Sequence, residues 1–343
     1  MNANILVIYT GGTIGMKEDP EDLTLKPFDF SQILEEVPEL RKFKVSLDTY
    51  TFDPLIDSSD VEPGMWIRLA ELIKEKYPFY DGFVVLHGTD TMAYSASALS
   101  FMLESLAKPV IFTGSQLPIG TPRTDGKENF VSAVEIAAAK DASGAPMVPE
   151  VAVYFDSTLL RGCRAIKVSA EQFSAFRSPN CPPLAQAGIQ IRYDKDVIRR
   201  PMGDGVSIGI QTHLDTRVSI LKVHPGITEQ VMRAVLCGPE TRAVILETYG
   251  SGNAPSSPWF LDIVNEADHM GKILVNITQC NEGSVNMDMY ATGKALKKSG
   301  VVSGYDSTTE AMLSKLFVLM GKSDNNAWVK KVLEDNMRGE ITK

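Results

Sequence analysis

The sequence predicts an α/β fold in two domains, from its length, a series of short apolar segments and the helical patterns between them. With 343 residues, 44% of them hydrophobic, the chain can form two sizeable cores. The apolar segments are rich in Val and Ile with little polar alternation, which is typical of strands buried on both faces of a parallel sheet. They lie at residues 4–10, 83–88, 109–114 and 151–155, and start again near residues 207, 243 and 272.

Helical patterns alternate with these segments and indicate helices that cover a sheet. One helix is predicted over residues 63–77, with Pro63 in its first turn and an apolar stripe at spacings of three and four. The stripe consists of Trp66, Leu69, Ile73 and Tyr77. In a second helix, over residues 124–140, Glu128 follows Asp125 by three residues, which is the pattern of a reciprocal capping box.

The two domains are expected to meet in a segment of different composition. Residues 177–212 are rich in Pro, Gly and charged residues and show little periodicity, and a strand–helix pattern starts again beyond them. We therefore expect an N-terminal domain over residues 1–190, a linker over residues 191–212 and a C-terminal domain over residues 213–343.

The charge and the N-terminus argue against several classes of protein. The formal net charge is -9 and no dense block of Lys and Arg is present, so broad binding to nucleic acid or to an anionic membrane surface is not expected. The first basic residue is Lys17, which argues against a signal peptide, and no apolar run is long enough to cross a bilayer. We expect a cytoplasmic protein.

The cysteines and histidines indicate neither disulfides nor a metal site. The cysteines are far apart and form no CxxC pair, so reduced thiols are expected at Cys163, Cys181, Cys237 and Cys280. The last of these is interpreted as a buried, inert thiol rather than a reactive one. The histidines are isolated, without the spacing of metal ligands. No metal or other cofactor is expected.

Two of the predicted strands end in similar polar turns. The first strand ends in "YTGGTIG", which contains Thr13, and the strand over residues 83–88 ends in "HGTDT", which contains Thr89 and Asp90. Glycines let the backbone turn sharply and let a ligand approach its N–H groups. Ligands of open α/β sheets gather at the carboxyl ends of parallel strands. If the two strands are neighbours, the three side chains lie at one rim of the sheet.

These residue types suit nucleophilic catalysis, although each turn also has a simpler interpretation. A threonine hydroxyl can attack a substrate when a base such as a lysine lies nearby, and an aspartate can bind a ligand's ammonium group. The simpler interpretation takes the glycines as a plain turn, and Thr89, Asp90 or Thr91 as the N-cap of a helix from about Ala93. His87 is interpreted as a hydrogen-bonded histidine at a strand end rather than as a base. The turn has neither phosphate-binding pattern, GxGxxG or GxxxxGK[ST].

In combination, the two turns are far more specific. The pair "TGGTIG" and "HGTDTM" resembles the two signature motifs of the L-asparaginase family. The whole chain resembles the bacterial cytoplasmic, type I branch of that family, across both domains and without a large insertion. Supporting segments are "PLIDSSD" (54–60), "ALSFMLE" (98–104), "PVIFTGSQLP" (109–118), "FRSPN" (176–180), "YGSGNAP" (249–255), "NITQC" (276–280) and "YATGKAL" (290–296).

The resemblance implies a role for each site residue. Thr13 would attack the side-chain amide of L-asparagine, and Thr89 would activate the attack together with Lys167 of "RGCRAIK". Asp90 would bind the substrate's α-ammonium group, and the backbone N–H of Thr89 would stabilise the oxyanion. A polar turn would hold the α-carboxylate and α-ammonium end of the substrate: Asp57, Ser58 and Ser59. Without the resemblance, a surface charge is the favoured interpretation of Lys167.

The same resemblance implies the architecture, the assembly and the reaction. The N-terminal domain would be a doubly wound, mostly parallel sheet that carries the site, and the C-terminal domain a smaller three-layer α/β unit. Family members form intimate dimers, often paired into tetramers, in which Asn253 would reach the substrate of the neighbouring subunit. The implied reaction converts L-asparagine to L-aspartate and ammonia. Two alternatives remain open: an amidase acting on glutamine or another amide, and a non-catalytic sensor of aspartate or asparagine.

Two departures from the family's pattern affect the expected activation of the nucleophile and the expected regulation. Family members carry a tyrosine in the loop after the first motif, where this chain has Leu23 and Leu25 and no tyrosine. Members with a separate effector site carry an arginine and a threonine where this chain has Glu247 and Ile166, so we expect no activation by asparagine at such a site. Residues 15–30 are interpreted either as a lid that closes over substrate or as a plain exposed loop.

Overall fold

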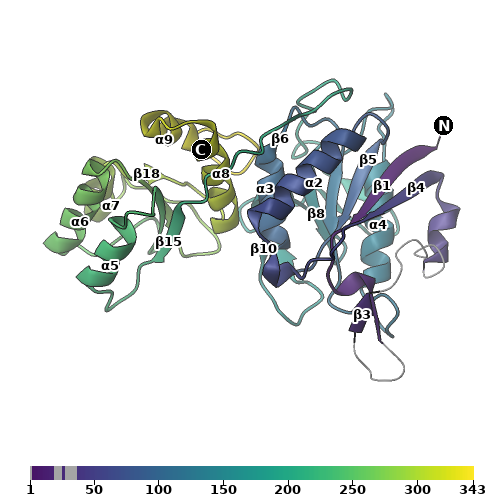
Figure 1. Ribbon diagram of the computed structural model, residues 1–343, viewed down its shortest axis with the longest axis horizontal. Coiled ribbons are helices and arrows are strands. Elements are labelled where there is room, and N and C mark those ends of the chain that lie inside the picture. Colours follow the sequence, from purple (N-terminus) through teal and green to yellow (C-terminus); the bar gives the residue numbers. More distant parts are fainter. Residues whose placement is uncertain (1, 19–24, 28–36) are drawn as a thin grey trace. The chain divides into compact units, whose positions relative to one another are not determined.

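The chain forms two compact units, Met1–Ile210 and Gln211–Lys343, in the computed structural model (Figure 1). The structure describes residues 2–18, 25–27 and 37–343. Each unit contains one main sheet with helices packed against it, which confirms the predicted α/β class.

The N-terminal unit is built on an eight-stranded sheet. From one edge to the other its strands are β13 (Arg192–Tyr193), β12 (Ala185–Gln186), β9 (Thr158–Arg161), β8 (Val151–Phe155), β7 (Val110–Thr113), β5 (Gly82–Leu86), β1 (Ala3–Tyr9) and β4 (Val45–Thr51). The strands from β8 to β4 run parallel, whereas β9, β12 and β13 are joined in antiparallel fashion. The sheet is therefore mostly parallel, as predicted.

Helices cover both faces of this sheet, so the central strands are buried on each side (Figure 1). In β1, Ile5 and Val7 pack in a core with Phe130 of α4 (Gly126–Ala138), and the intervening Leu6 and Ile8 are also buried. The other helices in the described part of this unit are α2 (Pro63–Lys76) and α3 (Met92–Met102), which pack against each other. The predicted apolar stripe of α2 is confirmed by the burial of its members: Trp66, Leu69, Ile73 and Tyr77.

Short elements complete the N-terminal unit. Two-stranded sheets are formed by β2 (Met16–Glu18) with β3 (Leu25–Pro27), by β6 (Leu103–Glu104) with β14 (Gly209–Ile210), and by β10 (Ile166–Lys167) with β11 (Phe176–Arg177). Single 3-10 turns are η1 (Thr13–Gly15), η3 (Pro38–Lys42), η4 (Ser58–Asp60) and η5 (Gly162–Arg164). The strand predicted near residue 207 is thus only the short β14, outside the main sheet.

The segment predicted as a linker, residues 191–212, belongs largely to the N-terminal unit, so its predicted start at residue 191 is wrong. β13 extends the main sheet within it, and a buried ion pair between Glu150 and Arg161 fixes the chain that follows. Arg161 donates to Glu150 at 2.7 Å and to the carbonyl of Val197 at 2.7 Å, and Glu150 accepts from the backbone N–H of Arg199 at 2.6 Å. The backbone of the predicted linker is thus held by a buried ion pair of the N-terminal unit.

The predicted capping box at the start of α4 is also wrong. Asp125 is the N-cap residue but makes no side-chain cap bond; its carboxylate accepts from the backbone N–H groups of Gln116 and Leu117 instead. Glu128 accepts from the hydroxyls of Ser132 and Tyr154. Both carboxylates thus hold neighbouring segments rather than the helix terminus.

The C-terminal unit is a three-layer α/β structure around four parallel strands, as predicted. Its strands are β15 (Val218–Lys222), β16 (Ala243–Thr248), β17 (Ile273–Thr278) and β18 (Val302–Ser303). One face packs against α5 (Glu229–Leu236), α6 (Pro258–His269) and α7 (Ala291–Lys298), and the other against α8 (Thr309–Lys322) and α9 (Asn326–Leu333). Lys315 of α8 is fully buried and pairs with Glu340 at 2.6 Å, which anchors the last residues of the chain.

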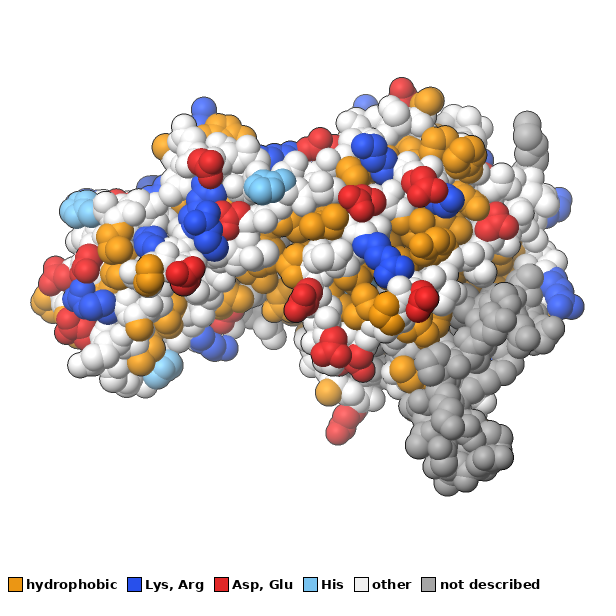
Figure 2. Space-filling model, in the orientation of Figure 1, with side chains coloured by type: hydrophobic (Ala, Val, Ile, Leu, Met, Phe, Trp, Pro, Cys, Tyr) orange, Lys and Arg blue, Asp and Glu red, His pale blue; other side chains and the backbone are white. Residues whose placement is uncertain are grey.

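The surface carries mixed charges, and acidic and basic side chains are interspersed on the face shown in Figure 2. None of the described helices is both long and apolar enough to cross a membrane. All of the cysteines are free. Cys280 is exposed, which contradicts the expectation that it is buried, because it lies in the loop directly after β17 rather than within the strand.

The buried pair between Glu150 and Arg161 gives a test of this architecture. Arg161→Met should lower the free energy of unfolding by about 3–5 kcal/mol, because Glu150 would remain buried without a counter-ion. Arg192→Met, at an exposed position of β13, should leave stability within about 0.5 kcal/mol. Thermal unfolding of the three proteins measures the difference, and a wild-type midpoint for Arg161→Met would contradict the role of the pair.

Candidate active site

Three neighbouring strands of the large sheet end at the same rim. In the register of the sheet, Tyr9 at the end of β1 lies opposite Leu86 at the end of β5, which in turn lies opposite Thr113 at the end of β7. The chain leaves β1 toward β4 on one side and later returns to β5 on the other. This reversal creates a switch point of the kind at which α/β sheets bind ligands.

The turns after β1 and β5 are in direct backbone contact. A Cβ atom added at Gly12 would lie 2.5 Å from both Cα and N of Gly88, and one added at Gly88 would lie 2.5 Å from the hydroxyl oxygen of Ser58. Gly12 also has a φ of 92°, in the region that favours glycine. Because Thr13 and Thr89 directly follow these two glycines, the predicted meeting of both turns at one rim is present in the structure.

Three of the predicted site residues form one hydrogen-bonded cluster. The ammonium nitrogen of Lys167 lies 2.9 Å from the hydroxyl oxygen of Thr89 and 2.6 Å from a carboxylate oxygen of Asp90. Lys167 is carried by β10 and its side chain is 19% exposed, whereas that of Asp90 is 61% exposed. A hydroxyl, an amine and an accessible carboxylate thus meet at the end of β5.

The polar turn at residues 57–59 lies against this cluster. The Ser58 hydroxyl accepts from the backbone N–H of Asp90 at 3.4 Å, and the Ser58 carbonyl accepts from the Thr91 hydroxyl at 2.7 Å. Asp57 accepts from both the backbone N–H and the hydroxyl of Ser59, and these two hydrogen bonds hold the pKa of its carboxyl below the usual value. Asp57 and Ser59 are exposed and Ser58 is buried.

His87 is a buried, fully hydrogen-bonded residue, as expected. Its Nδ1 lies 2.7 Å from the carbonyl oxygen of Gly88, and its Nε2 lies 2.8 Å from the hydroxyl of Ser95. The simpler interpretation of the turn as an N-cap is not supported, because the N-cap residue of α3, Thr91, makes no side-chain cap bond. The hydroxyl of Thr91 bonds to Ser58 instead.

Two residues that sequence reasoning did not select also hold the site together. Gln116 accepts from the Thr89 hydroxyl at 3.4 Å and donates to the carbonyl of Gln172 at 3.1 Å. Tyr9 is buried and its hydroxyl donates to the carbonyl of Gly12 at 3.2 Å. The position of Gln116, just after the third parallel strand, is the signal that could have identified it.

Other predicted features belong to different parts of the chain. Asn253 belongs to the C-terminal unit, where its side chain accepts from the Thr292 hydroxyl at 3.1 Å. Much of the predicted lid, residues 19–24 and 28–30, lies outside the described residues.

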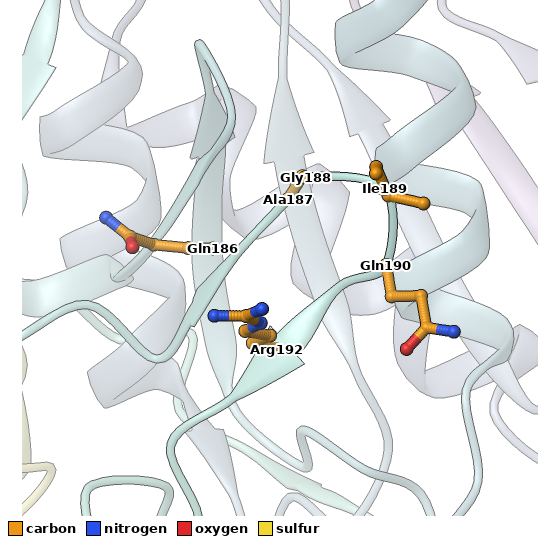
Figure 3. Close-up of a pocket in the computed structure, with 6 residues that line it drawn as sticks. All are labelled: Gln186, Ala187, Gly188, Ile189, Gln190 and Arg192. Atoms are coloured by element: carbon orange, nitrogen blue, oxygen red, sulfur yellow. The ribbon is translucent and has the colours of Figure 1, made fainter.

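A hollow of about 360 Å³ lies along the loop between β12 and β13, where Ile189 points away from Gln186 and Arg192 (Figure 3). No predicted site residue lines this hollow.

The described part of the chain contains no group of three His, Cys, Asp or Glu side chains that could hold a metal ion. The chemistry available at the rim is that of hydroxyls, one amine, carboxylates and backbone N–H groups. This set can bind an amino acid through its charged groups and can support nucleophilic attack at a carbonyl.

Comparison with known families assigns the chain. The model of the asparaginase N-terminal domain matches residues 4–199, and that of the glutaminase/asparaginase C-terminal domain matches residues 217–333. The chain therefore belongs to the asparaginase family. Both matches are consistent with the two units of the structure.

Individual relatives agree over the whole chain. L-asparaginase 1 of Escherichia coli K12 is 43% identical over 340 residues, which cover 99% of this chain and 98% of the relative. The crystal structure of L-asparaginase I from Vibrio cholerae is 41% identical, with a TM-score of 0.90 and full coverage of both chains. The thermostable L-asparaginase from Thermococcus kodakarensis is 32% identical, with a TM-score of 0.89 and 99% coverage of both chains.

The burial of His87 predicts a pH dependence of stability. Desolvation lowers the pKa of His87 to about 4, whereas an unfolded histidine titrates near about 6.5. As the pH falls from 6.5 to 4, the unfolded state takes up a proton that the folded state does not, so the free energy of unfolding should fall by up to about 3 kcal/mol.

Urea unfolding at pH 7 and pH 4.5 measures this change. His87→Asn, which removes the titrating group, should show a smaller difference between the two pH values than the wild type. An equal difference in both proteins would contradict the assignment.

Proposed function

We propose that this protein hydrolyses the side-chain amide of L-asparagine with Thr13 as the nucleophile, giving L-aspartate and ammonia. The observation that carries the proposal is the cluster of Thr89, Asp90 and Lys167 at the rim where the Thr13 turn contacts the Thr89 turn. The amidohydrolase activity itself follows from membership of the asparaginase family and from 43% identity to an L-asparaginase over the full chain. The protein is an enzyme that acts on a small molecule.

In this proposal Thr13 attacks the amide carbon, and Thr89 and Lys167 move the proton. The Lys167 amine already contacts the Thr89 hydroxyl, so a proton can pass between them without rearrangement of the backbone. The tetrahedral intermediate places a negative charge on the former carbonyl oxygen. Its collapse breaks the C–N bond, and the proton taken from Thr13 leaves with the departing ammonia; water then cleaves the Thr13 ester to give L-aspartate. The backbone N–H of Thr89 is the proposed donor to that oxyanion.

The substrate's charged end is assigned to the carboxylates and to the polar turn. Asp90 binds the α-ammonium group, for which its exposed carboxylate is accessible. Since Asp90 pairs with Lys167 in this structure, substrate binding has to share or replace that ion pair. The turn of Asp57, Ser58 and Ser59 then holds the α-carboxylate and α-ammonium end through its hydroxyls and backbone.

The assembly and the location complete the proposal. We expect a homodimer or homotetramer in which Asn253 of one subunit contributes to the substrate site of another. We also propose that the protein acts in the cytoplasm, in keeping with its resemblance to the cytoplasmic, type I branch of the family. Glutamine differs from asparagine by one methylene, worth about 1–3 kcal/mol in a pocket, so a slower reaction with glutamine is expected.

The nucleophile assignment is tested by four substitutions. Thr13→Ala should abolish ammonia release without loss of the fold, whereas Thr13→Ser, which keeps a hydroxyl, should retain turnover. Thr89→Val and Lys167→Met should lower kcat by about 10²–10⁴-fold with little change in KM, because they remove proton transfer. An ammonia assay with circular dichroism as the folding control decides the matter; wild-type turnover by Thr13→Ala would refute the assignment.

Glu247 predicts a hyperbolic dependence of the rate on asparagine concentration, without activation at a second site. Glu247 is half-buried at the end of β16 and accepts from the Thr309 hydroxyl at 2.7 Å, so a carboxylate occupies this position. A carboxylate there repels the carboxylate of asparagine, and the rate should depend hyperbolically on asparagine concentration. Initial rates over a wide concentration range test this, and a sigmoidal curve abolished by Glu247→Gln would contradict it.

A further inference from the structure

A continuous chain of hydrogen bonds runs behind the Thr89 turn. The indole N–H of Trp66 donates to the Ser95 hydroxyl oxygen at 2.9 Å, and that oxygen lies 2.8 Å from Nε2 of His87. On the other side of the ring, Nδ1 of His87 lies 2.7 Å from the carbonyl oxygen of Gly88. All of these side chains are buried, with His87 only 1% exposed. This series of hydrogen bonds joins α2 and α3 to the end of β5.

The chemistry of the end groups fixes the direction of every bond. An indole N–H can only donate and a carbonyl oxygen can only accept. Nδ1 of His87 therefore carries the proton, and in the neutral ring Nε2 accepts from the Ser95 hydroxyl. The bonds run in one direction, from Trp66 through Ser95 and His87 to Gly88. Burial, which lowers the pKa of His87 to about 4, keeps the ring in this neutral form.

The last acceptor in this series of hydrogen bonds, the carbonyl of Gly88, belongs to the peptide group that carries the proposed oxyanion donor. The carbonyl of Gly88 and the N–H of Thr89 are the two ends of the same planar amide. A donor on the carbonyl fixes the plane of that amide, and the polarisation it causes makes the N–H a stronger donor. A bond to the Gly88 carbonyl therefore acts directly on the group proposed to meet the oxyanion.

We infer that His87 is a positioning residue for catalysis, which holds the Gly88–Thr89 peptide in the orientation in which its N–H stabilises the transition state. This inference rests on the proposed function. His87 is not a base in this role, because Nδ1 bonds to a backbone carbonyl and Nε2 to Ser95, so both ring nitrogens are already taken by partners other than the Thr89 hydroxyl. Trp66 and Ser95 act through it by fixing the tilt of the imidazole ring.

The turn after β1 shows the same device. The buried hydroxyl of Tyr9 donates to the carbonyl of Gly12, which shares its amide group with the N–H of Thr13. Each of the two threonines is thus preceded by a glycine whose carbonyl is held from behind by a buried side chain. The repetition at both turns argues that the orientation of these peptides, rather than the burial of one histidine, is what the structure maintains.

The test observes the Gly88–Thr89 peptide group directly by NMR. The sequence contains three Gly–Thr pairs, at 12–13, 88–89 and 120–121. Protein labelled with ¹³C at the glycine carbonyl and with ¹⁵N in threonine therefore gives three correlated NMR signals. His87→Leu, which removes the donor, should move the 88–89 signal and leave that of 120–121 in place. It should also lower kcat by about tenfold with KM within about twofold.

Two further variants separate positioning from folding. Ser95→Ala keeps His87 but removes its Nε2 partner, and should move the 88–89 signal less and lower kcat less than His87→Leu. His87→Asn, whose amide N–H can still reach the Gly88 carbonyl, should recover most of the lost kcat. The matched control is Ser97→Ala, which removes another buried hydroxyl of α3, bonded to the carbonyl of Gly162, and should change neither readout.

The inference is overturned if His87→Leu and Ser95→Ala keep wild-type kcat, or if kcat falls while the 88–89 signal stays in place. It is also overturned if Ser97→Ala has the same effect as Ser95→Ala, since the loss would then reflect general packing of α3. Failure of the proposed function has a different result: Thr13→Ala would keep its turnover whatever the His87 variants do.

Discussion

The backbone contact between Gly12 and Gly88 is the constraint on which the site depends. The two glycines follow neighbouring parallel strands, and the hydroxyl and backbone N–H of Thr10 both bond to the carbonyl of Leu86, so the turns begin already joined. Without a side chain at either position, the turns approach to van der Waals contact. The threonine that follows each glycine therefore lies at the same rim of the sheet, and the Ser58 side chain lies against Gly88.

The ion pairs discussed above are of two kinds, buried pairs that fix segments of chain and a partly exposed pair at the candidate site. Glu150 with Arg161, and Lys315 with Glu340, are buried and surrounded by backbone partners, so they fix segments of chain in place. Lys167 with Asp90 is partly open to solvent. An exposed pair costs little to separate, which suits the proposed role of Asp90 as the carboxylate that receives the ammonium group of the substrate. In that proposal, Lys167 is held by an interaction that substrate can replace.

Much of the fold could be predicted because central parallel strands are buried on both faces and therefore appear as continuous apolar runs. β4 was not predicted by this criterion because it is an edge strand. Its residues alternate between half-buried and exposed at its start and are exposed beyond it. β12 and β13, each of two residues, carry too little pattern to detect. The segment after β13 misled the analysis in the opposite sense. Its composition, rich in Pro and charged residues, suggests a linker, but the backbone of Val197 and Arg199 bonds to the buried pair of Glu150 and Arg161.

The site was predictable where residue type and strand-end position coincide, as at Thr89 and Asp90. It was not predictable where function depends on a partner distant in sequence. Asp125 has the spacing of a helix cap, but its carboxylate is taken by Gln116 and Leu117, and no local pattern shows this. Likewise His87 could be placed at a strand end, whereas its connection to Trp66 through Ser95 exists only in three dimensions.

The paired glycines also limit how this enzyme can be diversified. A larger residue at Gly12 cannot be compensated at Gly88, because the atoms in its way are backbone, and Gly88 is itself confined by Ser58. Gly12 is therefore closed to replacement, whereas Gly88 can change only together with Ser58, whose side chain confines it. Directed-evolution libraries do better to randomise the loop at residues 187–190, where Ile189 is fully exposed and a Cβ at Gly188 meets only the carbonyl of Gln190 at 3.8 Å.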